Sequence, residues 1–380
     1  MPVYLDHNAT TPMRPEARQA LLDALDRCGN ASAVHSVGRG ARSILEQARL
    51  LIAKGVCAQP NDIIFTSGGT EADNLAIEGA VRGGGITRII HTVSEHEAVA
   101  RCAECTGLPV ELLPINRDGI ADLDWLKNRL AELDETERVL VCLHAANNET
   151  GVIQPIADAG RIIRDAGGLF HIDAVQALGK IPFDFAASGA HYAAVSAHKV
   201  GGPQGIGALM LSCDAPFDVP KRGGGQERGR RSGTENVAGA WAFAKALEAC
   251  LVDGDKWTQI AAWRDHIEEA LLKLDPDICI LGRNAPRTPN TTALCKLGWE
   301  GGMQVIALDL AGVCVSSGSA CSSGKAGVSK TWASMMCEKS AGCTIRVSLG
   351  WNTTEADVDA FIRAWSNEFA RVKPRLKEIA

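Results

Sequence analysis

The chain has 380 residues, enough for two or three domains or subdomains. Hydrophobic residues make up 46% and charged residues 22% of it, which is typical of a globular protein in water. With 39 basic and 45 acidic residues the formal net charge is −6, so we expect no nucleic-acid partner. No apolar run approaches the roughly 18 residues of a membrane span, and we expect no membrane association.

The 13 cysteines are scattered at irregular spacing along the chain. An odd number in a chain of this length fits reduced thiols in a cytosol better than a disulfide framework. The first residues, Met1 to Thr11, lack the basic-then-apolar pattern of a secretory signal. We therefore expect a cytoplasmic protein in which most cysteines are small buried hydrophobes.

Short apolar runs alternate with polar or glycine-rich corners and helix-like segments over the first two thirds of the chain. The predicted strands are Ile63–Thr66, Arg88–Val93, Val139–His144, Leu169–Ile172 and Tyr192–Val195, and the predicted helices include Ala72–Val81, Glu97–Cys105 and Ile156–Ala166. Alternation of this kind, with fully apolar strands, predicts a mainly parallel sheet covered by helices. We expect it to form a large α/β domain over residues 14–250.

After about residue 250 the pattern changes to the amphipathic helix Trp257–Lys273, then shorter strands and loops, and a final helix over Glu355–Ala370. We expect a smaller α+β domain made of residues 251–380, with the N-terminal arm, residues 1–13, packed on it. Within this domain the stretch of about 316–335 starts with small residues and carries Cys321. With little apolar bulk to bury, it is predicted to be a mobile, exposed loop.

Reactive side chains fall just past the carboxyl ends of the predicted strands. In open α/β sheets this edge is where ligands bind, so we expect one shared site. The residues at this edge are Thr70, His96, Asn148, Asp173, Gln176, His198 and Lys199.

The segment Ser67–Thr70 opens a predicted helix. Gly69 and its neighbour would let the backbone approach an anion, with free N–H groups and the Thr70 hydroxyl as donors. A plain helix N-cap explains the same residues equally well. A Walker-type phosphate loop is excluded, because the Gly-x4-Gly-Lys pattern is absent here.

Lys199 stands on a tight corner right after an apolar strand. In such a dry position a lysine can lose its proton and bond covalently to a carbonyl, although most lysines at strand ends are surface residues. Asp173 could pair with a protonated pyridine nitrogen or simply cap the next helix. His96 could stack on a flat ring or move protons, or could be structural.

Three more features indicate anion or thiol chemistry. The basic, glycine-rich segment Lys221–Thr234 favours a local anion site over a nucleic-acid patch or a solvated loop, because no aromatics are interleaved. Cys321 lies near Lys325, which favours the thiolate, over the alternative of an inert linker cysteine. Arg346 lies in an apolar strand, so it must be paired or bind an anion, and its fork suits a carboxylate.

Taken together, these segments resemble the cysteine desulfurases of the NifS/IscS type, which belong to the class-V aminotransferase family with the pyridoxal-5′-phosphate (PLP) fold type I. Nine blocks carry the resemblance and follow the family's order from end to end. They are Tyr4–Pro12, Thr66–Asn74, Ser94–His96, Asn147–Gly151, His171–Gln176, Ser196–Gly207, Gly223–Thr234, Ser316–Ser323 and Thr344–Gly350.

The resemblance implies a role for each candidate residue. Lys199 would hold PLP covalently and move the proton of the substrate Cα, and His96 would stack on the ring. Asp173 would hold the ring nitrogen and Gln176 the ring oxygen. The cofactor phosphate would be bound by Gly69, Thr70, Ser196 and His198 of one subunit and Thr234 of the other, in a homodimer. Asn148, beside the cofactor, and Arg346 would bind the substrate carboxylate.

The implied reaction takes the sulfur of L-cysteine, releases L-alanine and leaves a persulfide on Cys321. The loop around Cys321 is similar to the branch with a long mobile loop, and it would deliver sulfur to an acceptor such as an iron–sulfur scaffold protein. No intrinsic metal is implied, although Cys321 would transiently ligate cluster iron in a scaffold complex.

Some features depart from the family's commonest pattern, and they leave the sulfur acceptor open. Trp351 stands where an arginine is expected, and the corner Val200–Gly202 has no aromatic residue. The sequence also stops at Ala380, where the housekeeping branch continues into an extension. Rival functions are selenocysteine lysis or transamination at the same site, or a sulfur carrier whose pocket is a relic.

Overall fold

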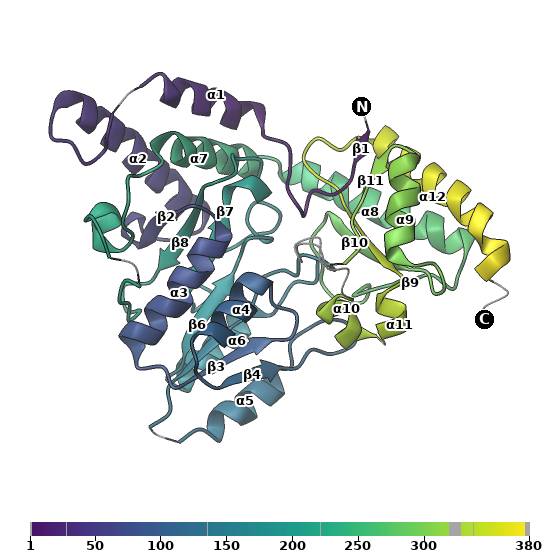
Figure 1. Ribbon diagram of the computed structural model, residues 1–380, viewed down its shortest axis with the longest axis horizontal. Coiled ribbons are helices and arrows are strands. Elements are labelled where there is room, and N and C mark those ends of the chain that lie inside the picture. The colour runs from purple at the N-terminus through teal and green to yellow at the C-terminus, as the bar shows by residue number, and fades with distance from the viewer. Residues whose placement is uncertain are drawn as a thin grey trace.

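The computed structural model of the protein describes residues 2–27, 29–134, 136–220, 222–318, 328–336 and 338–376. Its centre is a seven-stranded sheet in the order β2-β8-β7-β6-β5-β3-β4 (Figure 1). The strands are β2 (Ile63–Thr66), β3 (Arg88–Thr92), β4 (Val110–Leu113), β5 (Val139–Cys142), β6 (Leu169–Asp173), β7 (Tyr192–Ser196) and β8 (Gly207–Leu211). Neighbours from β4 to β7 run parallel, and only β8 pairs antiparallel, with β7 and β2. The predicted α/β fold with a mainly parallel sheet is confirmed.

Helices cover both faces of this sheet because successive strand residues point to opposite sides. Ile63 and Phe65 belong to the core on one face and Ile64 to the core on the other. The first core is closed by α1 (Pro15–Leu25), α2 (Ser36–Gly55), α5 (Leu123–Ala131), α6 (Ile156–Asp165) and α7 (Val237–Leu251), and the second by α3 (Gly69–Gly84) and α4 (Glu97–Cys105).

The C-terminal part forms a separate layered unit beside the large sheet (Figure 1). Its antiparallel sheet has the order β12 (Thr344–Ser348), β10 (Thr291–Cys295), β9 (Cys279–Ile280). The N-terminal strand β1 (Val3–Tyr4) pairs in parallel with β11 (Val313–Cys314) of this unit. The helices here are α8 (Gly254–Leu274), α9 (Gly301–Leu310), α10 (Lys330–Met335), α11 (Glu338–Ala341) and α12 (Glu355–Leu376).

Most predicted element bounds agree with the structure to within a few residues. Strand Ile63–Thr66 and helix Glu97–Cys105 have the predicted bounds, whereas the helix predicted over Ala72–Val81 begins at Gly69 and runs to Gly84. It ends there because Gly85, with φ of 63°, adopts the left-handed conformation that terminates helices. The division into residues 14–250 and 1–13 with 251–380 stays a prediction.

Helix α10 lies inside the stretch of about 316–335 that was predicted to be mobile. It buries Trp332, and Ser316 at the start of the stretch forms a bridge with Arg346 of β12. Among the helices of the described ranges, none combines the length and apolarity needed to cross a membrane.

Candidate active site

A cavity of about 490 Å³ opens at the carboxyl ends of the parallel strands. It is reached by side chains from both sheets and from the N-terminal arm. Of the sequence-predicted site residues, ten line it: Gly69, Thr70, His96, Asn148, Asp173, Gln176, Ser196, His198, Lys199 and Arg346. Residues from positions 69 to 199 are thus brought together at the predicted edge, because parallel strands end on the same side, and Arg346 reaches the cavity from β12 of the other sheet.

One wall of the cavity is the N-terminus of α3. The first N–H groups of a helix have no partner within it, and here they belong to Gly69 and Thr70, which line the cavity. A Cβ on Gly69 would lie 2.8 Å from Val175 Cγ2, so glycine lets the start of the helix lie close to Val175 without displacing its side chain. Ser196, buried at the end of β7, lies next to this helix start. The arrangement suits a phosphate group.

Asp173 lies at the end of β6 and is almost fully buried. Burial raises the pKa of its carboxyl, while the charge of His96 and the N–H of Val175 act in the opposite direction. A cationic N–H group of a ligand would therefore stabilise its charged form.

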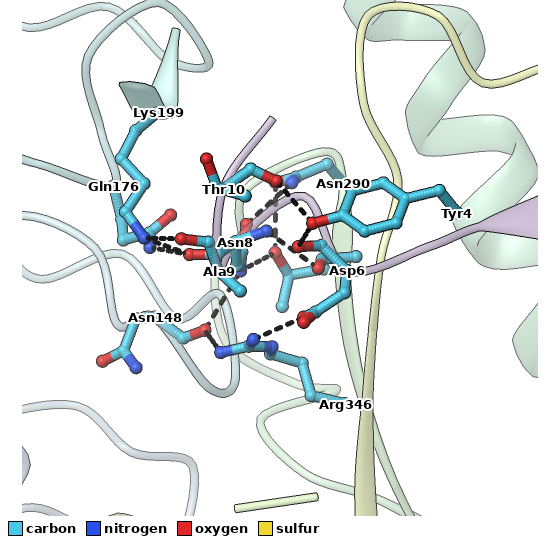
Figure 2. Close-up of polar contacts among 12 residues, drawn as sticks. Tyr4, Asp6, Asn8, Ala9, Thr10, Asn148, Gln176, Lys199, Asn290 and Arg346 are labelled. Carbon is cyan, nitrogen blue, oxygen red and sulfur yellow. Dashed lines mark hydrogen bonds and ion pairs between the residues drawn. The ribbon is translucent and has the colours of Figure 1, made fainter. Parts of the chain in front are cut away.

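Lys199 follows β7 and extends toward the N-terminal arm. Its Nζ donates to the backbone carbonyl of Asn8 and, at 2.7 Å, to that of Ala9. In Figure 2 the side chains of Lys199 and Gln176 approach these carbonyls from the same side, and Gln176 Nε2 also donates to the Asn8 carbonyl at 3.0 Å. The arm therefore forms part of the site itself.

Two histidines, His96 and His198, line the cavity. His96 is the N-cap of α4, and its Nδ1 accepts a hydrogen bond of 3.1 Å from the N–H of Ala98. It is therefore both a structural cap and a cavity residue. Burial and the nearby charges of Lys199 and Lys180 lower the pKa of His198 to about 4, so His198 is neutral at pH 7.

Arg346 lies on β12 and is nearly buried. Its Nη1 donates to the Asn148 carbonyl at 3.0 Å, and its Nη2 forms an ion pair of 2.6 Å with Asp6 (Figure 2). Two edges of the guanidinium are thus held in place from two other segments of the chain. A guanidinium fixed in this way presents the rest of its donors in a defined direction, which suits a carboxylate.

Glu95, next to His96 in the sequence, forms a buried pair with His144 that was not expected from the sequence. Glu95 Oε1 accepts hydrogen bonds of 2.8 Å from both the backbone N–H and the Nδ1 of His144. Although burial favours the neutral form, the charge and hydrogen bonds of His144 lower the pKa of Glu95 to about 2. Both side chains line the cavity.

Two sequence-predicted residues are not placed in the cavity of this chain. Thr234 is exposed and does not line it. Its segment is attached nearby, since Arg231 forms an ion pair of 3.0 Å with Glu71, one residue beyond Thr70. Cys321 lies outside the described residues.

Asn8 and Lys180 were missed as site residues. Asn8 Oδ1 accepts a hydrogen bond of 3.0 Å from Lys180 Nζ, and Asn8 lines the cavity. Asn8 falls within one of the blocks that carry the resemblance, and Lys180 stands four residues after Gln176 on the following turns. These were the only signals of either residue in the sequence.

The comparisons with known proteins agree along nearly the whole chain. The class-V aminotransferase family matches residues 3–361. An "IscS-like cysteine desulfurase" of Mycobacterium tuberculosis is 39% identical over 97% of each chain, and "Cysteine desulfurase NifS" of Azotobacter vinelandii is 37% identical over 95% of this chain and 91% of its own. The structure of a NifS-like protein from Rickettsia africae superposes with a TM-score of 0.90 at 33% identity, over 97% of this chain and all of its own. The chain belongs to the class-V aminotransferase family and, within it, to the cysteine desulfurases.

Proposed function

We propose that this protein removes the sulfur of L-cysteine with the help of PLP, releases L-alanine and keeps the sulfur as a persulfide on Cys321. The observation that carries the proposal is the convergence of Lys199, Asp173 and the α3 N-terminus on one cavity. The similarity to cysteine desulfurases over 95–97% of the chain supports the same function.

The residues of the cavity fit PLP on three counts. Its volume of about 490 Å³ accommodates a small aromatic cofactor and an amino acid. Asp173 is a buried carboxyl with a raised pKa, which suits a pyridinium nitrogen. The N–H groups of Gly69 and Thr70 suit the phosphate. When bound, PLP supplies an electron sink for the bond broken at the substrate Cα.

The remaining roles fall to this chain's own groups. Lys199 Nζ would hold the cofactor and, once released from it, would take up the proton of the substrate Cα. The carbonyls of Asn8 and Ala9, which accept hydrogen bonds from Nζ, would stabilise the resulting ammonium group. Arg346 and Asn148 would bind the substrate carboxylate, with Arg346 already oriented by Asp6. His96 would cover the ring from α4.

Sulfur transfer would be carried out by Cys321. Its thiolate attacks the substrate sulfur, forming an S–S bond as the Cβ–S bond breaks, and Cβ keeps the electron pair and takes up a proton to give alanine. The described residues on both sides of the segment 319–327 support this assignment. Ser316 is hydrogen-bonded to Arg346 through the backbone, and Val328 lines the cavity.

The partners follow from the same assignment. The chain acts as a homodimer in which Thr234 completes the phosphate site of the partner subunit. The exposure of Thr234, on a segment held to the helix of Thr70 by Arg231 and Glu71, supports this arrangement. A cytoplasmic sulfur acceptor such as an iron–sulfur scaffold protein then takes the sulfur, and Cys321 transiently ligates cluster iron in that complex.

The test measures alanine and protein-bound persulfide formed from L-cysteine in the wild type and in Cys321→Ala. We expect both products in the wild type and neither above background in the variant. Cys213→Ala, which removes an exposed cysteine elsewhere, serves as the matched control and should behave as the wild type. Equal alanine production by Cys321→Ala would contradict the proposed sulfur transfer.

A further inference from the structure

Lys180 is a buried lysine to which the proposed reaction gives no role. Its exposed fraction is 7%, and its Nζ donates to two amide oxygens, Asn8 Oδ1 at 3.0 Å and Gln176 Oε1 at 2.5 Å. No aspartate or glutamate of the described ranges pairs with it. A buried amine without a carboxylate is costly, so these two hydrogen bonds are what compensates for its burial.

The amine donates to both oxygens in either protonation state. Burial lowers the pKa of Lys180 well below its ordinary value, and the charges of Lys199 and Arg346 lower it further. A neutral amine still carries two N–H groups, which is the number that the two amide oxygens require.

The hydrogen bonds of Lys180 determine which way the Gln176 amide faces. A carboxamide has an oxygen that only accepts and an NH₂ group that only donates. Since Oε1 accepts from Lys180, Nε2 must point the other way, where it donates to the Asn8 carbonyl at 3.0 Å (Figure 2). The second N–H of Nε2 then faces the cavity, which Gln176 lines.

The same amine orients the amide of Asn8. Asn8 Oδ1 accepts from both Lys180 and Asn290 at 3.0 Å, so Asn8 Nδ2 donates, to the Asn148 carbonyl at 3.0 Å and to Thr291 Oγ1 at 2.9 Å. The Asn148 carbonyl is also the acceptor for Arg346. Lys180 thus stands at the start of a series of hydrogen bonds that runs through Asn8 to Thr291 on β10 and, by way of the Asn148 carbonyl, to Arg346 on β12.

We propose that Lys180 is a positioning residue that holds the Gln176 amide with its N–H groups toward the cavity, so that Gln176 presents a donor to the ring oxygen of PLP. In the reversed orientation the amide oxygen would face that oxygen, and two acceptors would repel each other. The inference rests on the proposed function, because the ring oxygen of bound PLP is the acceptor.

The test is a double-mutant cycle on the binding of PLP to the apoprotein, with the absorbance spectrum of the bound cofactor as a second readout. The variants are Lys180→Met, Gln176→Ala and the double variant. We expect Lys180→Met to raise the Kd for PLP about tenfold, the effect of one lost hydrogen bond to a charged group, and to shift the spectrum in the same direction as Gln176→Ala. The Kd of the double variant for PLP should be no higher than that of whichever single variant binds PLP more weakly.

Additive effects of the two substitutions, or an unchanged Kd and spectrum in Lys180→Met, would overturn the inference. Lys180→Gln retains an N–H donor and should recover part of the affinity, which a purely structural role does not predict. The cycle is repeated with Lys180→Ala, so that the result does not depend on the folding of one variant. Lys245→Met, which removes a lysine paired with Glu248 on α7, is the control and should match the wild type.

The two proposals fail in different ways. Wild-type apoprotein that takes up no PLP contradicts the proposed function. Normal uptake by the wild type, combined with additivity in the cycle, contradicts only the role of Lys180.

Discussion

Arg346 and Asp6 form an ion pair of 2.6 Å at the point where the N-terminal arm reaches the cavity. The arginine side chain is 4% exposed and the aspartate side chain 18% exposed. The arm is held further by Tyr4, whose hydroxyl donates to the carbonyls of Asp6 at 3.0 Å and Thr10 at 2.9 Å (Figure 2). The guanidinium that is expected to bind the substrate carboxylate therefore already has a carboxylate beside it.

Substitution Asp6→Asn should lower the KM for L-cysteine by roughly 5-fold, or about 1 kcal/mol. The amide keeps an oxygen that can accept from Arg346 Nη2 but removes a negative charge that repels the substrate carboxylate. Steady-state alanine production over a range of cysteine concentrations measures the change. Asp6→Ala, which also removes the acceptor, should raise KM instead. A KM that rises in both variants would show that the charge of Asp6 is needed for substrate binding.

Substitution Lys199→Ala should reduce alanine formation by about 10²–10⁴-fold, the range typical of losing a general acid–base group. Borohydride treatment should link the cofactor to the wild type at Lys199 and should leave the variant unlabelled, as peptide mapping by mass spectrometry would show. Lys256→Met, far along the chain on α8, is the control and should be labelled as the wild type. Label on another lysine of the wild type contradicts the assignment of Lys199.

The segment that carries Thr234 is anchored by a buried ion pair. Arg49 donates to both oxygens of Glu227, at 2.7 and 2.8 Å, and the two side chains are 4% and 2% exposed. Glu227 and the following Arg228 have φ values of 45° and 59°, a left-handed conformation that is strained for residues other than glycine. The ion pair holds this strained turn against β2, because Glu227 also accepts from the N–H of Phe65 at 3.0 Å.

Substitution Glu227→Gln should lower the free energy of unfolding by about 3 kcal/mol, the lower end of the range for breaking a buried ion pair, because the buried Arg49 then keeps only the half-exposed Glu46, at 3.2 Å, as a counter-charge. Urea denaturation followed by circular dichroism measures the loss. The double variant Arg49→Met/Glu227→Leu should regain most of it, since no unpaired charge remains. A double variant that is less stable than Glu227→Gln would show that the turn itself needs the ion pair.

The strand ends and the residues directly after them could be predicted from the sequence, because apolar runs are readable locally. Asp173 and Lys199 were found in this way, and the structure places both in one cavity. The hydrogen bond between Asn8 and Lys180 joins residues 172 positions apart. It depends on how the N-terminal arm crosses between the two sheets, which no local pattern encodes.

The ion pair of Glu95 with His144 was missed for a related reason. The two residues follow neighbouring parallel strands, β3 and β5, but the sequence does not indicate that these strands are adjacent. His96, one residue later, was found because it follows the predicted strand Arg88–Val93 and because a histidine can stack on a flat ring or move protons. In this protein the chemistry of a residue was visible when its own type and its place after a strand indicated it, and hidden when it depended on a partner that a neighbouring strand contributes.

Acid should destabilise the protein through buried histidines, and His191 offers a test away from the cavity. Its Nδ1 accepts a hydrogen bond of 3.0 Å from the N–H of Phe170, which requires the unprotonated nitrogen. Burial, with a contribution from the charge of Arg164, lowers the pKa of His191 to about 4 from an ordinary value of 6.5. The unfolded chain therefore binds a proton that the folded chain does not, in the window between these two values.

Because the unfolded state gains the proton, the free energy of unfolding should fall as the pH drops from about 6.5 to 4. His191 alone should account for up to about 3 kcal/mol of this fall, the equivalent of its shift in pKa. Urea denaturation at pH 7 and at pH 4.5 measures the slope. His191→Gln keeps an acceptor for the N–H of Phe170 and does not titrate. The slope of its free energy of unfolding against pH should therefore be smaller than that of the wild type, by the amount that corresponds to about one proton. An equal slope in the wild type and the variant would place the acid sensitivity in other groups, of which the buried His171, with its pKa also lowered to about 4, is the next to test.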